Sequence, residues 1–154
     1  MEQSNKEKII GKIRKCSIVI SVFCLALAAF NGFALYQSLS GTLGISLTET
    51  DQTRITVGYC FGVVIMLLSA VLFFTMSRSE RPFTQKKTWL VVLIGAVLFL
   101  NALVPTVIMI PLIGIKALLY LVTSSSLLES LMFLFAALIM YYASILQQES
   151  DETL

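Results

Sequence analysis

Four long stretches of this chain carry almost no charge, and this pattern constrains the fold more than any other feature. The stretches cover residues 16–36, 55–76, 88–110 and 127–146. A helix needs about 20 apolar residues to cross a hydrocarbon core about 30 Å thick. Because backbone polar groups cannot stay unpaired in lipid, each stretch should be helical. The sequence therefore predicts an all-α membrane protein, a four-transmembrane-helix bundle that forms one membrane domain over residues 1–154.

The composition excludes several classes of protein. Hydrophobic residues make up 57% of the chain and charged residues 13%, against about 45–50% and about 25% in soluble domains. Soluble enzymes, disordered chains, coiled coils and nucleic-acid-binding domains do not have this balance. Histidine is absent, which removes the commonest general base and metal ligand, and the three cysteines have no metal-binding spacing. We expect no enzymatic activity, no cofactor or metal and no nucleic-acid partner.

The basic residues predict the orientation in the membrane. Of the 11 lysines and arginines, all but Arg54 and Lys116 lie before the first span or between the second and third spans. Since cytoplasmic segments are enriched in basic residues, both termini should be cytoplasmic in a multi-pass protein of the cell membrane. The first span is longer than the 7–15 residues of a signal-peptide core, so we expect it to be retained.

The segment 111–126 is too apolar for an ordinary loop, yet Pro111, Gly114 and Lys116 interrupt it. Its apolar and polar residues separate at helical spacing, which favours a short helix lying at the outer interface. The alternative is an extension of the third helix that bends at Pro111.

Polar residues within the spans are costly in lipid and need an explanation. Glu129, Asn31 and Asn101 all fall in the outer half of the predicted bundle. If they face inward, they form a candidate polar site that lines a water-filled cavity. Alternatively, Glu129 reaches the outer water or caps its helix, and the asparagines bond to neighbouring helices. Pro105 should kink the third helix and free a backbone carbonyl near Asn101.

Gly58 and Gly62 form a G-x-x-x-G pattern on the second span. Glycine pairs at this spacing let two membrane helices approach closely. We expect these residues to be a helix-packing site against Ala26, Ala29 or Gly32 of the first span. The alternative is packing against a second copy of the chain, which would give a homodimer.

The loop between the second and third spans contains Arg81, Pro82, Phe83 and Thr84. Proline ends the second helix, because it disfavours a helical conformation at Arg81. Phe83 should dip into the interface, and the Thr84 hydroxyl should cap the third helix. These residues predict a tight cytoplasmic turn and a candidate partner-binding loop.

The Arg81–Thr84 loop, followed by a basic helix start, resembles the hallmark loop of a bacterial family of four-span membrane proteins of unknown function. The apolar last span and its acidic tail, residues 145–154, resemble that family's ending. Gln85 and Lys86 stand where the family usually has Glu-Asn, and Glu152 stands where it usually has an apolar residue. The resemblance implies an integral membrane protein with no established activity, often encoded beside a helix-turn-helix regulator.

Two functions remain open. The first is a non-enzymatic accessory or regulatory protein in the lipid bilayer that binds a membrane or cytoplasmic protein through its cytoplasmic loop. The alternative is a small dimeric transporter or channel that uses Asn31, Asn101 and Glu129, with the dimer packed through Gly58 and Gly62.

Overall fold

Four long helices make up the part of the chain that the computed structural model describes, which is every residue except 1, 41–48, 80–83, 115–120, 123 and 153–154. The helices are α1 Glu2–Leu39, α2 Glu49–Arg78, α3 Gln85–Ile113 and α5 Ser125–Glu152. Each is long and apolar enough to cross a membrane, and the described residues form no strand. The structure thus confirms an all-α fold of four membrane-spanning helices and a multi-pass membrane protein.

Each predicted span lies inside one of these helices, and each helix is longer than its span at both ends. The third helix continues through Pro111 and ends at Ile113. Gly114 ends it with a φ of 58°, a backbone conformation that favours glycine, and its amide donates to the carbonyl of Ile110 at 2.9 Å. The first residues of the 111–126 segment therefore extend the third helix. Residues 115–120 and 123 lie outside the described part of the chain.

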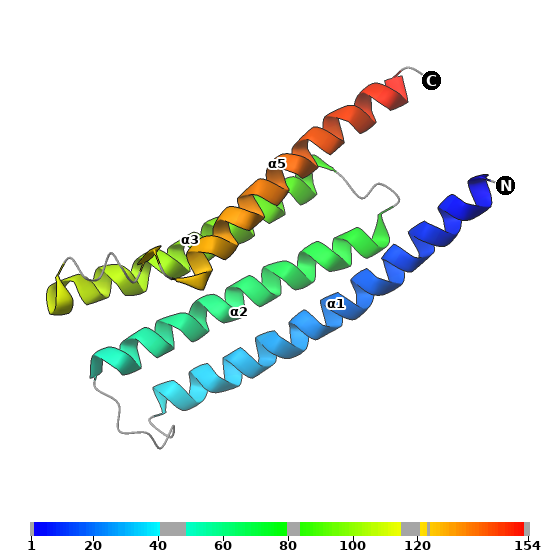
Figure 1. Ribbon diagram of the computed structural model, residues 1–154. Helices are drawn as coiled ribbons and strands as arrows, with labels where there is room; N and C mark the ends of the chain where they lie inside the picture. Colours follow the sequence, from blue (N-terminus) through cyan, green and yellow to red (C-terminus); the bar gives the residue numbers. More distant parts are fainter. Residues whose placement is uncertain (1, 41–48, 80–83, 115–120, 123, 153–154) are drawn as a thin grey trace.

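The helices pack in the order in which they occur in the chain (Figure 1). Helix α1 packs against α2, α2 against α3, and α3 against α5. Within the described ranges, no Cα atoms of α1 and α3, of α1 and α5, or of α2 and α5 lie within 8 Å of one another. Both termini lie at the same end of the molecule as the junction between α2 and α3. We call this the terminal end and the other the opposite end.

Small and hydroxyl-bearing residues bring α1 and α2 together. Ser17, Ser21, Cys24 and Ala28 recur every three or four residues on α1 and are buried, so they share one helix face. Such residues allow close approach of membrane helices, whose association gains little from the hydrophobic effect. The Ser21 hydroxyl also donates to the carbonyl of Ala70 on α2 at 3.0 Å.

The contact between α3 and α5 combines apolar packing with a hydrogen bond. The apolar core of the molecule consists of Leu72, Val91, Ile94, Leu98 and Ala137. Beside it, the fully buried Ser130 donates from its hydroxyl to the carbonyl of Gly95 at 2.8 Å. A Cβ at Gly95 would lie 3.2 Å from Leu134 carbons, so glycine is what allows α5 to approach α3 this closely.

Candidate functional site

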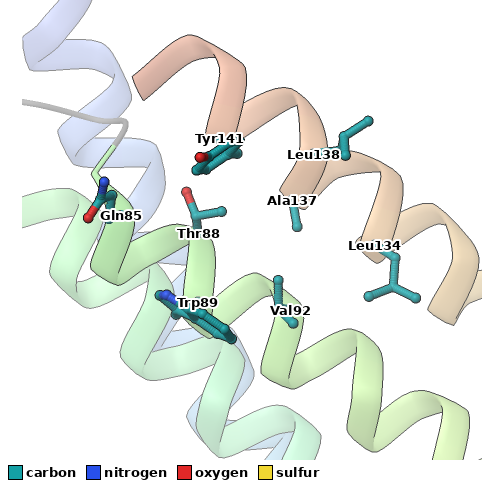
Figure 2. A pocket seen from close by; sticks show the side chains of 8 residues that line it. All are labelled: Gln85, Thr88, Trp89, Val92, Leu134, Ala137, Leu138 and Tyr141. Carbon is teal, nitrogen blue, oxygen red and sulfur yellow. The ribbon is translucent and has the colours of Figure 1, made fainter. Parts of the chain in front are cut away.

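A groove runs between α3 and α5 in the half of the molecule near the terminal end (Figure 2). We call it the α3–α5 groove; its volume is about 430 Å³. Its lining residues are Gln85, Thr88, Trp89 and Val92 of α3 with Leu134, Ala137, Leu138 and Tyr141 of α5.

The lining residues have the same sequence spacing in both walls of the groove. Each helix contributes residues at positions i, i+3, i+4 and i+7, starting from Gln85 on α3 and from Leu134 on α5. Residues at this spacing form one face of a helix over two turns, a length of about 10 Å at 1.5 Å per residue. The groove is therefore bounded by two continuous helix faces.

Exposed aromatic residues stand at the rim of the groove nearest the terminal end. Trp89 is 72% exposed and Tyr141 is 48% exposed. Figure 2 shows Tyr141 reaching from α5 toward Thr88 of α3. Tryptophan and tyrosine are enriched where a membrane meets water. The rim thus carries the residue types expected at a membrane–water interface.

Small, buried side chains form the floor of the groove. Ala137 is buried in the core, and the Thr88 side chain is buried with its hydroxyl donating to the carbonyl of Thr84 at 3.2 Å. Gln85 is exposed at the mouth of the groove and makes no side-chain hydrogen bond to the described residues. Its amide group is therefore open to an incoming molecule, as are the Tyr141 hydroxyl and the Trp89 indole N–H.

The chemistry of the groove is that of a binding surface. Its lining contains no carboxylate, amine, guanidinium or thiol, so it has no obvious general base or metal ligand. Among the described residues of the whole chain, no group of three or more His, Cys, Asp or Glu side chains could hold a metal ion.

The predicted partner-binding loop lies mostly outside the described residues. Arg81, Pro82 and Phe83 belong to the undescribed segment 80–83. Thr84 is described and is the N-cap residue of α3, with extended backbone angles, but its side chain makes no capping hydrogen bond. The expected hydroxyl cap is therefore wrong; the Thr84 carbonyl instead accepts bonds from the amides of Lys87 and Thr88, each at 3.0 Å.

The three predicted polar residues occupy three separate environments. The Asn31 side chain lies against Gly62 of α2 and donates to the carbonyl of Leu27 in its own helix at 2.8 Å. Asn101 donates from Nδ2 to the Ser126 hydroxyl at 3.0 Å. Glu129 is exposed on α5. The structure thus places Asn101 on the wall of a cavity, and no hydrogen bond among the described residues joins the three side chains.

The two glycines of the G-x-x-x-G pattern have different surroundings. A Cβ at Gly62 would lie 2.8 Å from Asn31 Oδ1, whereas one at Gly58 would meet nothing within 4 Å. Gly62 packs against the first span as expected, but through Asn31; of the three residues expected there, Ala26 and Ala29 are exposed and Gly32 is half-buried. Of the two glycines, only Gly62 allows α1 to approach closely, and the residue it faces is Asn31.

Sequence reasoning missed Trp89 and Tyr141. Trp89 is the only tryptophan in the chain, and both residues lie near the terminal ends of their spans. Their positions in the sequence could have indicated that they lie where the membrane meets water. That Trp89 and Tyr141 lie at the same groove could not be predicted, because it depends on how α3 and α5 are rotated relative to each other.

Comparison of the chain with protein-family models, with curated protein sequences and with solved structures gave no match.

Proposed function

We propose that this chain is a non-enzymatic accessory or regulatory membrane protein that binds a partner protein at its terminal end, with one helix of the partner seated in the α3–α5 groove. The excess of basic residues at the terminal end assigns that end to the cytoplasm under the positive-inside rule.

The observation that carries this proposal is the matched spacing of the two groove walls. A helix lying between them would meet one helix face on each side, and apolar grooves of proteins bind amphipathic helices in this way. No residue of α1 or α2 lines the groove, so these helices form neither of its walls.

Selectivity for a protein over lipid comes from polar groups and close packing. Lipid tails cover apolar side chains as well as a helix does, so only shape and hydrogen bonding distinguish a partner. Ala137 at the floor admits a close approach, and Gln85 at the mouth offers an amide to a polar residue of the partner. We therefore expect the partner helix to carry small residues toward Ala137 and one hydrogen-bonding residue near its cytoplasmic end.

Co-purification in mild detergent tests the proposal. Trp89→Ala removes an exposed rim residue, so the fold should survive while the partner is lost. Phe30→Ala is the matched control, because Phe30 is 67% exposed against 72% for Trp89 and lies on α1, which touches neither wall. The proposal requires one protein to be retained by the wild type and by Phe30→Ala and lost from Trp89→Ala. Recovery of only lipid or of further copies of this chain with the wild type would contradict it.

A further inference from the structure

One face of α1 joins basic residues to apolar residues in the half of the helix nearest the terminal end. Lys8, Lys12 and Lys15 lie at positions i, i+4 and i+7, and Val19 and Val22 continue the same spacing. Residues at this spacing share one face of a helix. We call the face formed by these five residues the α1 outer face.

The α1 outer face lies on the side of the helix away from α2. The buried residues Ser17, Ser21 and Cys24, which pack toward α2, are about 180° around the helix from it at 3.6 residues per turn. Val19 and Val22 are 68% and 61% exposed, and the two described lysine side chains of the face are exposed as well. Helix α1 stands at the edge of the molecule (Figure 1), and the described residues leave this face open.

The lysine charges on this face have no counter-charge. Within the described part of the chain, the Lys12 and Lys15 side chains make no hydrogen bond, ion pair or ring contact. No aspartate or glutamate occurs between residues 8 and 48, and Glu7, five residues before Lys12, lies on a different face. A group of like charges without a counter-charge attracts an anionic molecule.

The other basic side chains near the terminal end of α2 and α3 have different surroundings. Arg78 lies over the Phe74 ring at 4.5 Å. Lys87 is buried and already has an interaction within the chain. Lys86 is exposed and is the other basic residue of α3. On α2 and α3, the described residues thus offer no second pair of exposed lysines one turn apart on one face.

The depth of the two exposed lysines matches the headgroup layer of a membrane. The first predicted span begins at Cys16, so Lys15 and Lys12 lie about 1.5 and 6 Å outside it at 1.5 Å per residue. The polar layer on each side of the hydrocarbon core is about 5–8 Å thick. Val19 and Val22 lie inside the span, at the depth of the acyl chains. One phospholipid molecule therefore reaches both parts of the face.

We propose that the α1 outer face binds an anionic phospholipid, with Lys12 and Lys15 at its phosphate group and Val19 and Val22 along its acyl chains. The cytoplasmic assignment of the terminal end puts this lipid in the leaflet that carries anionic headgroups. The site lies on α1, away from the walls of the α3–α5 groove, so the lipid binds whether or not the partner proposed above exists.

Titration of phosphatidylglycerol into the purified protein in a non-ionic detergent, followed by native mass spectrometry, tests the proposal. Phosphatidylcholine is the matched lipid without net charge, and the wild type should retain at least one phosphatidylglycerol in preference to it. The double variant Lys12→Gln with Lys15→Gln should bind phosphatidylglycerol about thirtyfold more weakly, which is the contribution of two lysines at an anionic surface. Equal retention of the two lipids by the wild type would overturn the proposal.

Two further double variants assign the binding to this face. Lys12→Arg with Lys15→Arg keeps both charges and should bind phosphatidylglycerol as the wild type does. Arg78→Gln with Lys86→Gln removes the same charge from the terminal ends of α2 and α3, and it should also leave the affinity unchanged. Equal weakening by this control and by the double glutamine variant of α1 would contradict the site, because the net charge of the terminal end would then recruit the lipid.

Discussion

Gly62 and Gly58 lie one turn apart on α2, and the structure predicts that they respond differently to alanine. The new methyl group at Gly62 would lie 2.8 Å from Asn31 Oδ1 and 3.2 Å from Asn31 Cγ. The Asn31 side chain must therefore move, although its Nδ2 is held by the carbonyl of Leu27 at 2.8 Å. At Gly58 the new methyl group meets nothing within 4 Å.

The difference between the two variants isolates the cost of this contact. Replacing glycine by alanine inside a helix gains up to about 1 kcal/mol from helix propensity, and this gain is common to both positions. Overpacking adds a cost of about 1–3 kcal/mol at Gly62 alone. We therefore expect Gly62→Ala to have a free energy of unfolding about 1–3 kcal/mol lower than that of Gly58→Ala.

Unfolding of the purified protein by SDS in mixed micelles measures this difference. The Asn31→Ala background provides the internal check, because removing the Asn31 amide group should remove the penalty at Gly62. Free energies for Gly62→Ala and Gly58→Ala that agree within about 0.5 kcal/mol, the usual limit of additivity, would refute the packing described for α1 and α2. So would a penalty at Gly62 that persists in the Asn31→Ala background.

Two further predictions concern the contact between α3 and α5, and the same unfolding assay checks both. Gly95→Val should lower the free energy of unfolding by about 1–3 kcal/mol, because a Cβ there would lie 3.2 Å from Leu134 carbons; an unchanged value would mean that the helices do not approach this closely. Ser130→Ala should lower it by about 0.6 kcal/mol through loss of the interhelical bond to Gly95. Ser144→Ala, which removes a bond to Tyr141 of the same helix, is the control and should have little effect.

The four helices were predictable from the sequence because lipid allows so few alternatives. A stretch with almost no charge that is long enough to span the bilayer must satisfy its backbone within itself, so length and charge alone predict 16–36 and the other three spans. Their ends were less predictable. Pro111 was compatible with either a bend or a break, and the structure shows α3 continuing to Ile113.

The faces that the helices present to one another were not predictable. Lipid tails are as apolar as a protein core, so hydrophobic periodicity does not distinguish the two sides of a membrane helix. Ala28 and Ala29 are adjacent and chemically identical, yet only Ala28 is buried. The α3–α5 groove and the separation of Asn31 from Asn101 both depend on helix rotation, which requires the three-dimensional packing.

Photo-crosslinking in native membranes tests the proposed partner helix most directly. Leu138 lines the α3–α5 groove and its neighbour Ile139 does not, although both side chains are 54% exposed. A photoreactive residue at position 138 should crosslink to one other protein, whereas the same residue at position 139 should react only with lipid. Equal crosslinking from the two positions, or reaction with lipid alone at position 138, would contradict a partner helix in the groove.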